Sequence, residues 1–242
     1  MPNPSTPAQY ALILIDLAQS QGCDRNALLA GTQLAETGVA EMGARIRDED
    51  FARLAGNALV LTGDPALGLK LGLRLNLSAH AVLGQAFMTC RDLGQVIDLF
   101  MKYYHLLAPA LELDYQVHAG RCTLTTLSIA EEIAPEFSHE LIYAAVLNTL
   151  RGLLNRPALH LTIELPYPRP SHAAEYFAVF GDDVHFDCLR GRLSFPQALL
   201  ATPLPSSNPA LRALYEQECA RLLADLEGDA TVSDQTLRLL RK

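Results

Sequence analysis

The sequence predicts an α+β fold with an N-terminal helical part, then an antiparallel sheet of four or five strands with packed helices, and a C-terminal linker helix. Three observations predict this order. Apolar residues recur at the spacing of one helix face through residues 8–107, they alternate with polar residues in several short runs after that, and a proline-rich segment at 203–209 precedes the last helix. We therefore expect one domain at residues 1–205, and a linker helix with the start of a further domain at 206–242.

The N-terminal part is predicted to be helical because its apolar residues lie three or four positions apart. Several of these segments are preceded by a side chain whose oxygen can accept a hydrogen bond from a free backbone N–H. Asp64-Pro65 is a further start signal, since proline fits the first helical position. The predicted helices cover residues 8–21, 24–29, 48–61, 66–73, 79–89 and 93–107, and the candidate N-caps are Asp24, Asp48, Ser78 and Asp92.

The hydrophobic period changes from 3.6 to 2 after the last of these helices, which predicts the beginning of a sheet. Residues 111–117 and 121–129 are predicted to form two strands joined by a short turn. The alternation slips between Leu124 and Leu127, and this slip predicts a β-bulge. The three later strands are predicted at residues 159–165, 184–188 and 193–195.

Two helices are predicted among the strands and two after them. Residues 135–155 form a long helix that is apolar over most of its surface and is therefore expected to be buried, and a shorter helix covers 171–180. After the proline-rich segment comes an amphipathic helix, then a predicted linker at 227–231, then the first residues of another helix. The apolar stripe of the amphipathic helix comprises Leu211, Tyr215, Leu222 and Leu226.

Composition and charge argue against several classes of protein. Hydrophobic residues make up 50% of the chain and charged residues 19%, so a packed core is expected rather than disorder. The formal net charge of −8 repels phosphate backbones, so we do not expect these residues to bind nucleic acid. No window approaches the roughly 18 apolar residues of a membrane span. The 5 cysteines are scattered, as suits reduced thiols, so we expect a cytoplasmic location without membrane contact.

The usual sequence patterns of catalytic and metal sites do not occur. The sequence contains neither a GxSxG nucleophile elbow, nor an HExxH metal motif, nor a glycine-rich phosphate loop. His185 and Cys188 are three residues apart on a predicted strand, where they would lie on opposite faces and could not share an ion. Glu136 and Glu140 lie near a helix start, where the helix dipole favours acids. We therefore expect no enzymatic activity, no catalytic residue, no metal and no cofactor.

Polar side chains in otherwise apolar helices are candidates for a small-molecule pocket, which is typically apolar with a few placed polar groups. One such group lies near the end of the helix predicted at 93–107, and another lies on the long apolar helix. The alternative is that each is an ordinary core residue whose hydrogen bonds are satisfied inside the domain. The candidate ligand-binding residues are Tyr103, Tyr104, His105, His139, Tyr143 and Asn148.

Three groups of residues carry a resemblance to a known family. The first is DPALGLKLG at 64–72 with VLGQAFM at 82–88, the second is DLGQVIDLFMKYYHLL at 92–107, and the third is VHFD at 184–187 with LSF at 193–195, LL at 199–200 and PLP at 203–205. In this order and spacing they resemble the N-terminal effector domain of AraC/XylS-type transcription regulators, in the subgroup called arabinose-binding. The resemblance covers the chain from residue 8 to its end.

The resemblance implies a cytoplasmic, usually homodimeric bacterial protein that controls transcription in response to a small-molecule effector. In this family two helix-turn-helix units follow the sensing domain. Residues 232–241 resemble the beginning of the first unit, so we expect DNA binding only through a C-terminal domain that these residues lack. The founding member's domain is a jelly-roll sugar binder, but the helical first hundred residues here argue against carrying over either property. The apolar stripe of the last helix would pack either on a second copy or back on its own domain.

Two other functions stay open at this point. A stand-alone small-molecule binding or scaffold module without DNA binding would need no further domain after Lys242. An enzyme would have to use scattered side chains, and substitution of His139 or Cys122 would then abolish turnover. The family resemblance favours the ligand-sensing and dimerisation domain of a transcription regulator.

Overall fold

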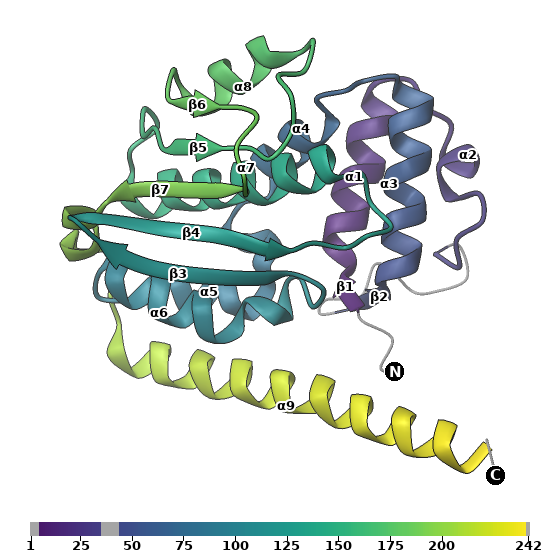
Figure 1. Cartoon of the computed structure of the whole chain (residues 1–242). Helices are drawn as coiled ribbons and strands as arrows, with labels where there is room; N and C mark the ends of the chain where they lie inside the picture. The colour runs from purple at the N-terminus through teal and green to yellow at the C-terminus, as the bar shows by residue number, and fades with distance from the viewer. Residues whose placement is uncertain (1–4, 35–43, 241–242) are drawn as a thin grey trace.

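The computed structural model describes residues 5–34 and 44–240 and has the α+β architecture that the sequence predicts (Figure 1). Its helices are α1 (Ala8–Ser20), α2 (Arg25–Leu29), α3 (Asp48–Thr62), α4 (Leu67–Arg74), α5 (Ala81–Met88), α6 (Leu93–Tyr103), α7 (Pro135–Leu154), α8 (Ala173–Phe180) and α9 (Pro209–Leu240). Its strands are β1 (Ser5–Pro7), β2 (Arg45–Arg47), β3 (Glu112–His118), β4 (Arg121–Ser128), β5 (Thr162–Glu164), β6 (Val184–His185) and β7 (Arg192–Pro196). β1 pairs with β2, and the others form one sheet in the order β3-β4-β7-β5-β6.

The first helices pack together at the N-terminal end of the chain, where α1 and α3 lie side by side (Figure 1). Asp24 caps α2 as predicted, because its carboxylate accepts a hydrogen bond from the backbone N–H of Ala27 at 2.9 Å. Asp48 is instead the first residue of α3 and does not cap it. Its carboxylate accepts a hydrogen bond from the Thr6 hydroxyl at 2.8 Å, which turns it away from its own helix.

The helix starts between α3 and α6 follow the predicted signals only in part. α4 begins at Leu67 rather than at Pro65. The Asp64 side chain accepts a hydrogen bond from the backbone N–H of Ala66, and this bond holds a turn ahead of the helix. Asn76, not Ser78, caps the next segment, which begins as a short 3-10 turn before α5. Asp92 caps α6 as predicted.

The hairpin of β3 and β4 confirms the predicted turn and the predicted bulge. Both residues of the turn have positive φ, which is the geometry that matches the twist of a two-residue hairpin. The pairing register shifts beside Glu112, so Leu127 of β4 is left without a residue opposite it. The slip in the sequence pattern therefore marks a real irregularity of the sheet.

One strand pair departs from the antiparallel sheet that we predicted, because β6 lies parallel to β5. The chain between them passes through α8, and a helical crossover places the next strand parallel to the previous one. Both strands are also shorter than predicted. The backbone N–H of Cys188 donates to the carbonyl of Leu165, and Asp187 has φ 56°, so the chain turns away from the sheet after His185.

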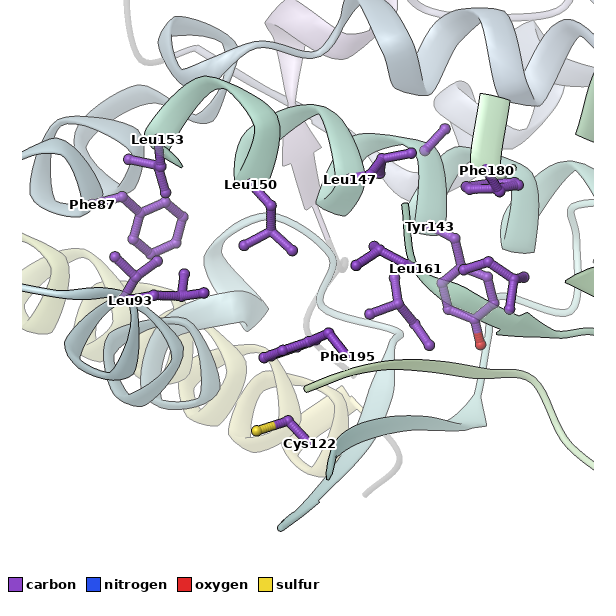
Figure 2. Packing of buried hydrophobic residues seen from close by; sticks show 14 of the residues in the cluster. Phe87, Leu93, Cys122, Tyr143, Leu147, Leu150, Leu153, Leu161, Phe180 and Phe195 are labelled. Atoms are coloured by element: carbon purple, nitrogen blue, oxygen red, sulfur yellow. The ribbon is translucent and has the colours of Figure 1, made fainter. Parts of the chain in front are cut away.

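α7 lies between the sheet and α4 and is buried along most of its length, as predicted (Figure 1). On the sheet side, Leu150 points from α7 toward Phe195 of β7 (Figure 2). On the other side, Gly68 and Gly72 of α4 face α7. A Cβ atom added to Gly72 would lie 2.6 Å from the Cβ of Ala144, so the two helices approach more closely than larger side chains would permit.

The buried side chains form two main clusters, one on each side of α7. The N-terminal cluster is built mainly from buried residues of α1, α2, α3 and α4 together with Phe137 at the start of α7. The sheet cluster is built mainly from buried residues of α5, α6, α7, α8 and the larger sheet, together with Cys219 of α9 (Figure 2). The fold thus has two packed regions that share one central helix.

α9 is a single helix from Pro209 to Leu240, so the predicted linker at 227–231 and the new helix after it are wrong. The segment contains no proline, and Gly228 inside a helix costs only about 1 kcal/mol, which is too little to end it. The expected division of the chain after residue 205 stays a prediction. No helix in the described ranges is both long and apolar enough to cross a membrane.

Candidate ligand-binding cavity

A cavity of about 180 Å³ lies where α6, α7 and the strands β3, β4 and β7 meet the N-terminal cluster. An engineered apolar cavity of about 150 Å³ in an unrelated protein binds benzene, so the volume suits a small organic molecule. Most of the lining is apolar. The lining residues with polar side-chain atoms are Thr6, Tyr10, Asp48, His80, Tyr104, Tyr115, Ser138 and Thr149.

The wall is apolar because each element turns one face toward the cavity. Val96 and Phe100 of α6, followed by Tyr104, lie one helical turn apart and line the same side. α7 contributes its own stripe from the opposite side. Tyr115 of β3 lies directly opposite Leu124 of β4, and both side chains face the cavity from the sheet.

A chain of three buried polar side chains crosses one wall of the cavity and joins α1 to α7. The hydroxyl of Tyr10 lies 2.7 Å from Nδ1 of His80, and Nε2 of His80 lies 3.1 Å from the hydroxyl of Thr149. Burial lowers the pKa of His80 to about 4 and raises the pKa of Tyr10. Both groups are therefore neutral at pH 7, and the chain is a set of neutral hydrogen bonds.

Asp48 brings a carboxylate to the lining at the start of α3. Its Oδ1 accepts a hydrogen bond from Thr6. Burial raises the pKa of Asp48, while the hydrogen bond from Thr6 and the charge of Arg45 act in the opposite direction. Each of the three nitrogens of Arg45 already donates within the fold, to the hydroxyl and carbonyl oxygens of Ser5 and to the carbonyl of Leu106.

Of the six candidate ligand-binding residues, only Tyr104 lines this cavity. Its hydroxyl accepts a long hydrogen bond of 3.4 Å from the backbone N–H of Leu113, which orients the ring. Tyr103 is buried in the sheet cluster, with the ammonium of Lys102 5.0 Å from its ring centroid. His105 packs against the ring of Tyr104, with the two centroids 4.1 Å apart.

The three candidates on α7 point elsewhere. His139 lines a second, more open pocket between β4 and the loop before β7. The hydroxyl of Tyr143 lies 2.8 Å from that of Thr126, and the amide of Asn148 donates to the carbonyl of Leu75 at 3.0 Å. The six side chains are thus not brought together at one site, and their role in binding stays a prediction.

Sequence reasoning did not single out Tyr10, His80 or Thr149, and it treated Asp48 only as a helix cap. These residues come from α1, the turn before α5, α7 and α3, which are far apart in the chain. The signal that could have found two of them is the one used for the other candidates, because Tyr10 and Thr149 are polar side chains on otherwise apolar, buried helix faces.

The acids Glu136 and Glu140 do not act as a pair. Glu140 is 1% exposed, and its Oε1 accepts hydrogen bonds from Tyr176 at 2.5 Å and from Nε2 of His172 at 2.9 Å. Burial raises its pKa, and these two hydrogen bonds act against that. Glu136 is exposed. The buried Glu140 therefore connects α7 to α8.

Within residues 5–34 and 44–240, no three His, Cys, Asp or Glu side chains lie close enough together to hold a metal ion. Nε2 of His185 lies 2.8 Å from Oδ1 of Asp183. The thiol of Cys188 is instead directed at the carbonyls of His185 and Phe186.

The apolar stripe of α9 packs largely on its own domain. Tyr215, Leu222 and Leu226 lie against the sheet cluster, and Cys219 between them is fully buried. Leu211 is different, because it is 41% exposed. Leu214, which we had not included in the stripe, is 62% exposed and lies on the outward side with it.

Comparison with known protein families gives one match that covers most of the chain. The family described as the arabinose-binding domain of AraC transcription regulators, N-terminal, matches residues 22–204.

Individual relatives are also transcription regulators. The chain is 34% identical to the ornithine utilization regulator of Pseudomonas aeruginosa over 235 residues, which are 97% of this chain and 69% of that protein. It is 22% identical over 227 residues to an uncharacterized helix-turn-helix-type regulator of Mycobacterium tuberculosis, covering 90% of this chain and 65% of the relative. The crystal structure of the regulator CdpR from Pseudomonas aeruginosa superposes with a TM-score of 0.55 at 19% identity, over 62% of this chain and 50% of that one, and so shares its fold. The chain thus spans about two thirds of the length of the curated relatives that it matches.

Proposed function

Because the chain belongs to the AraC-type transcription regulators with an arabinose-binding N-terminal domain, we propose that it senses a small-molecule effector for the full-length regulator. The relatives are regulators and not enzymes. The observation that carries the proposal is the apolar cavity of about 180 Å³ between the two clusters, with a few polar groups at its edge.

The name of one relative refers to ornithine utilization. Ornithine is charged at both ends of a short chain, so it would make few apolar contacts with this lining. We therefore do not propose ornithine as the effector of this chain.

We propose that α6 and α5 transmit ligand binding in the cavity to α9, because both helices line the cavity and contact α9. Val96 and Phe100 line the cavity, and on the same helix Lys102 donates to Glu216 of α9 at 3.1 Å. α5 lines the cavity through Phe87 and also packs against α9. A ligand that prefers one position of these helices would shift α9, by no more than its difference in affinity for the two states. We propose that DNA contact belongs to the part of the regulator beyond this chain, in keeping with the net charge of −8.

Ala145→Phe should block the cavity and reduce the affinity of any effector at least about tenfold, because a phenyl ring would fill much of the volume that the ligand needs. The measurement is thermal shift and calorimetry against a panel of metabolites in buffer at neutral pH. A specific ligand at about 100 times its dissociation constant stabilises the native state by about 2.7 kcal/mol. Val60→Phe is the matched control, since Val60 is 82% exposed on α3. Equal ligand binding by both variants would place the effector site outside this cavity.

We also propose that the outward side of α9 contacts a second copy of the chain, in keeping with the dimers usual in this family. Leu211→Glu combined with Leu214→Glu should then shift sedimentation from dimer to monomer, because two charges would be buried without partners. Leu189→Glu, at a residue that is 90% exposed on a loop, is the control and should leave the mass unchanged. A dimer that survives the α9 substitutions would assign the interface to another surface.

A further inference from the structure

Resting on the proposed sensing function, we propose that the effector is a small amine with an apolar body, whose ammonium group pairs with Asp48. The other polar groups of the lining are neutral hydroxyls, phenols and the His80 ring. A ligand held in this cavity therefore meets one charged side chain, and the sign of that charge selects the head group.

The apolar body of the ligand is inferred from the side chains that line the cavity. Phe51, Phe100, Ile142 and Phe195 come from α3, α6, α7 and β7 and surround the space with hydrocarbon and aromatic surface. Apolar surface buried from water contributes about 25 cal/mol per Å², so an aromatic or branched group gains most here. A strongly hydrated body with hydroxyls all around would lose hydrogen bonds to water that these side chains cannot replace.

The amine head group is inferred from an oxygen of Asp48 that has no hydrogen-bond donor among the described residues. Thr6 donates to Oδ1 of Asp48, and Oδ2 has no hydrogen-bond donor among residues 5–34 and 44–240. An ionised carboxylate only accepts hydrogen bonds, so Oδ2 can accept one from a ligand, and an ammonium group supplies both donors and the opposite charge. Pairing would also offset the cost of keeping Asp48 ionised in its half-buried position.

An anionic head group fits this end of the cavity poorly. Arg45 is the nearby cation, but it does not line the cavity, and three of its five N–H groups already donate to Ser5 and Leu106. Burial is the main cause that raises the pKa of Asp48, and the charge of Arg45 acts against it more strongly than the charge of Glu132 adds to it. An anionic head group beside Asp48 would therefore meet a carboxylate, with no lysine or arginine among the described residues that line the cavity.

The test uses three probes of nearly equal shape: 2-phenylethylamine, 2-phenylethanol and 3-phenylpropanoate. Calorimetry with the unmodified protein should rank the amine at least about tenfold above the other two, as expected for one charge-assisted hydrogen bond. Asp48→Asn should remove this advantage and leave the affinity for the alcohol within about threefold. Glu49→Gln is the control, because it removes the same charge from the same helical turn at a side chain that is 70% exposed and does not line the cavity.

The outcomes separate this inference from the proposed function. If 3-phenylpropanoate or 2-phenylethanol binds as well as the amine, the amine inference is overturned while the cavity remains a ligand site. The same holds if Asp48→Asn and Glu49→Gln reduce amine binding equally. If none of the probes binds, and the metabolite panel also yields nothing that Ala145→Phe blocks, both proposals fall. The ranking of the probes needs no variant, so it decides the question even if Asp48→Asn does not fold.

Discussion

Gly72→Ala should lower the free energy of unfolding by about 3 kcal/mol, at the upper end of what overpacking a core usually costs. The added Cβ atom would lie 2.6 Å from the Cβ of Ala144, 2.7 Å from the carbonyl oxygen of Leu141 and 2.9 Å from the backbone nitrogen of Ala145. Two of these three atoms belong to the backbone of α7, so they cannot move aside as a side chain would. α4 would have to shift away from α7, which would loosen both clusters.

Gly56→Ala in α3 is the matched control for this prediction. No atom lies within 4 Å of a Cβ added there, so the substitution should raise the free energy of unfolding by up to about 1 kcal/mol through helix propensity. Urea denaturation of both variants and of the unmodified protein gives the differences from the midpoints, provided that the slopes agree. If both substitutions stabilise the protein, the close approach of α4 and α7 is wrong.

The protein should lose about 3 kcal/mol of stability between pH 7 and pH 4 through His80 alone. Burial lowers the pKa of this ring from 6.5 to about 4 in the native state, whereas the unfolded chain takes up a proton near 6.5. The unfolded state therefore binds more protons in this range. The contribution is complete above pH 6.5, is lost as the pH falls toward 4, and does not change further below that.

His80→Gln separates this effect from other titrations. A glutamine amide can accept from Tyr10 and donate to Thr149, but it does not titrate. Acids such as Asp48 and Glu140, whose pKa values burial raises, change in the same range in both proteins and cancel in the comparison. Urea denaturation at several pH values should show a steeper loss in the unmodified protein than in the variant. Parallel curves would mean that His80 is hydrated.

The local elements that were predicted correctly from sequence are those whose signals are themselves local. The Asp24 and Asp92 caps, the β3–β4 hairpin and the bulge at Leu127 each depend on residues a few positions apart. The parallel pairing of β6 was missed for the opposite reason. Alternating residues at Val184 and Phe186 indicate a strand, but not which neighbour it joins or in which direction.

The cavity was the hardest part to predict, since its polar groups lie on separate elements. Tyr10 and His80 are 70 positions apart in the chain, and their hydrogen bond exists only after α1 has packed beside the turn before α5. The three neighbours Tyr103, Tyr104 and His105 illustrate the same limit, because one helical turn sends them in different directions and only one reaches the cavity.

The position of the cavity on the boundary between the two clusters has a thermodynamic consequence. The N-terminal cluster and the sheet cluster share α7, but each has its own buried surface and can open with its own free energy. A molecule in the cavity would touch Phe51 of one cluster and Phe195 of the other at once. Its binding energy would then oppose the separate opening of either region, so that occupancy would increase the cooperativity of unfolding.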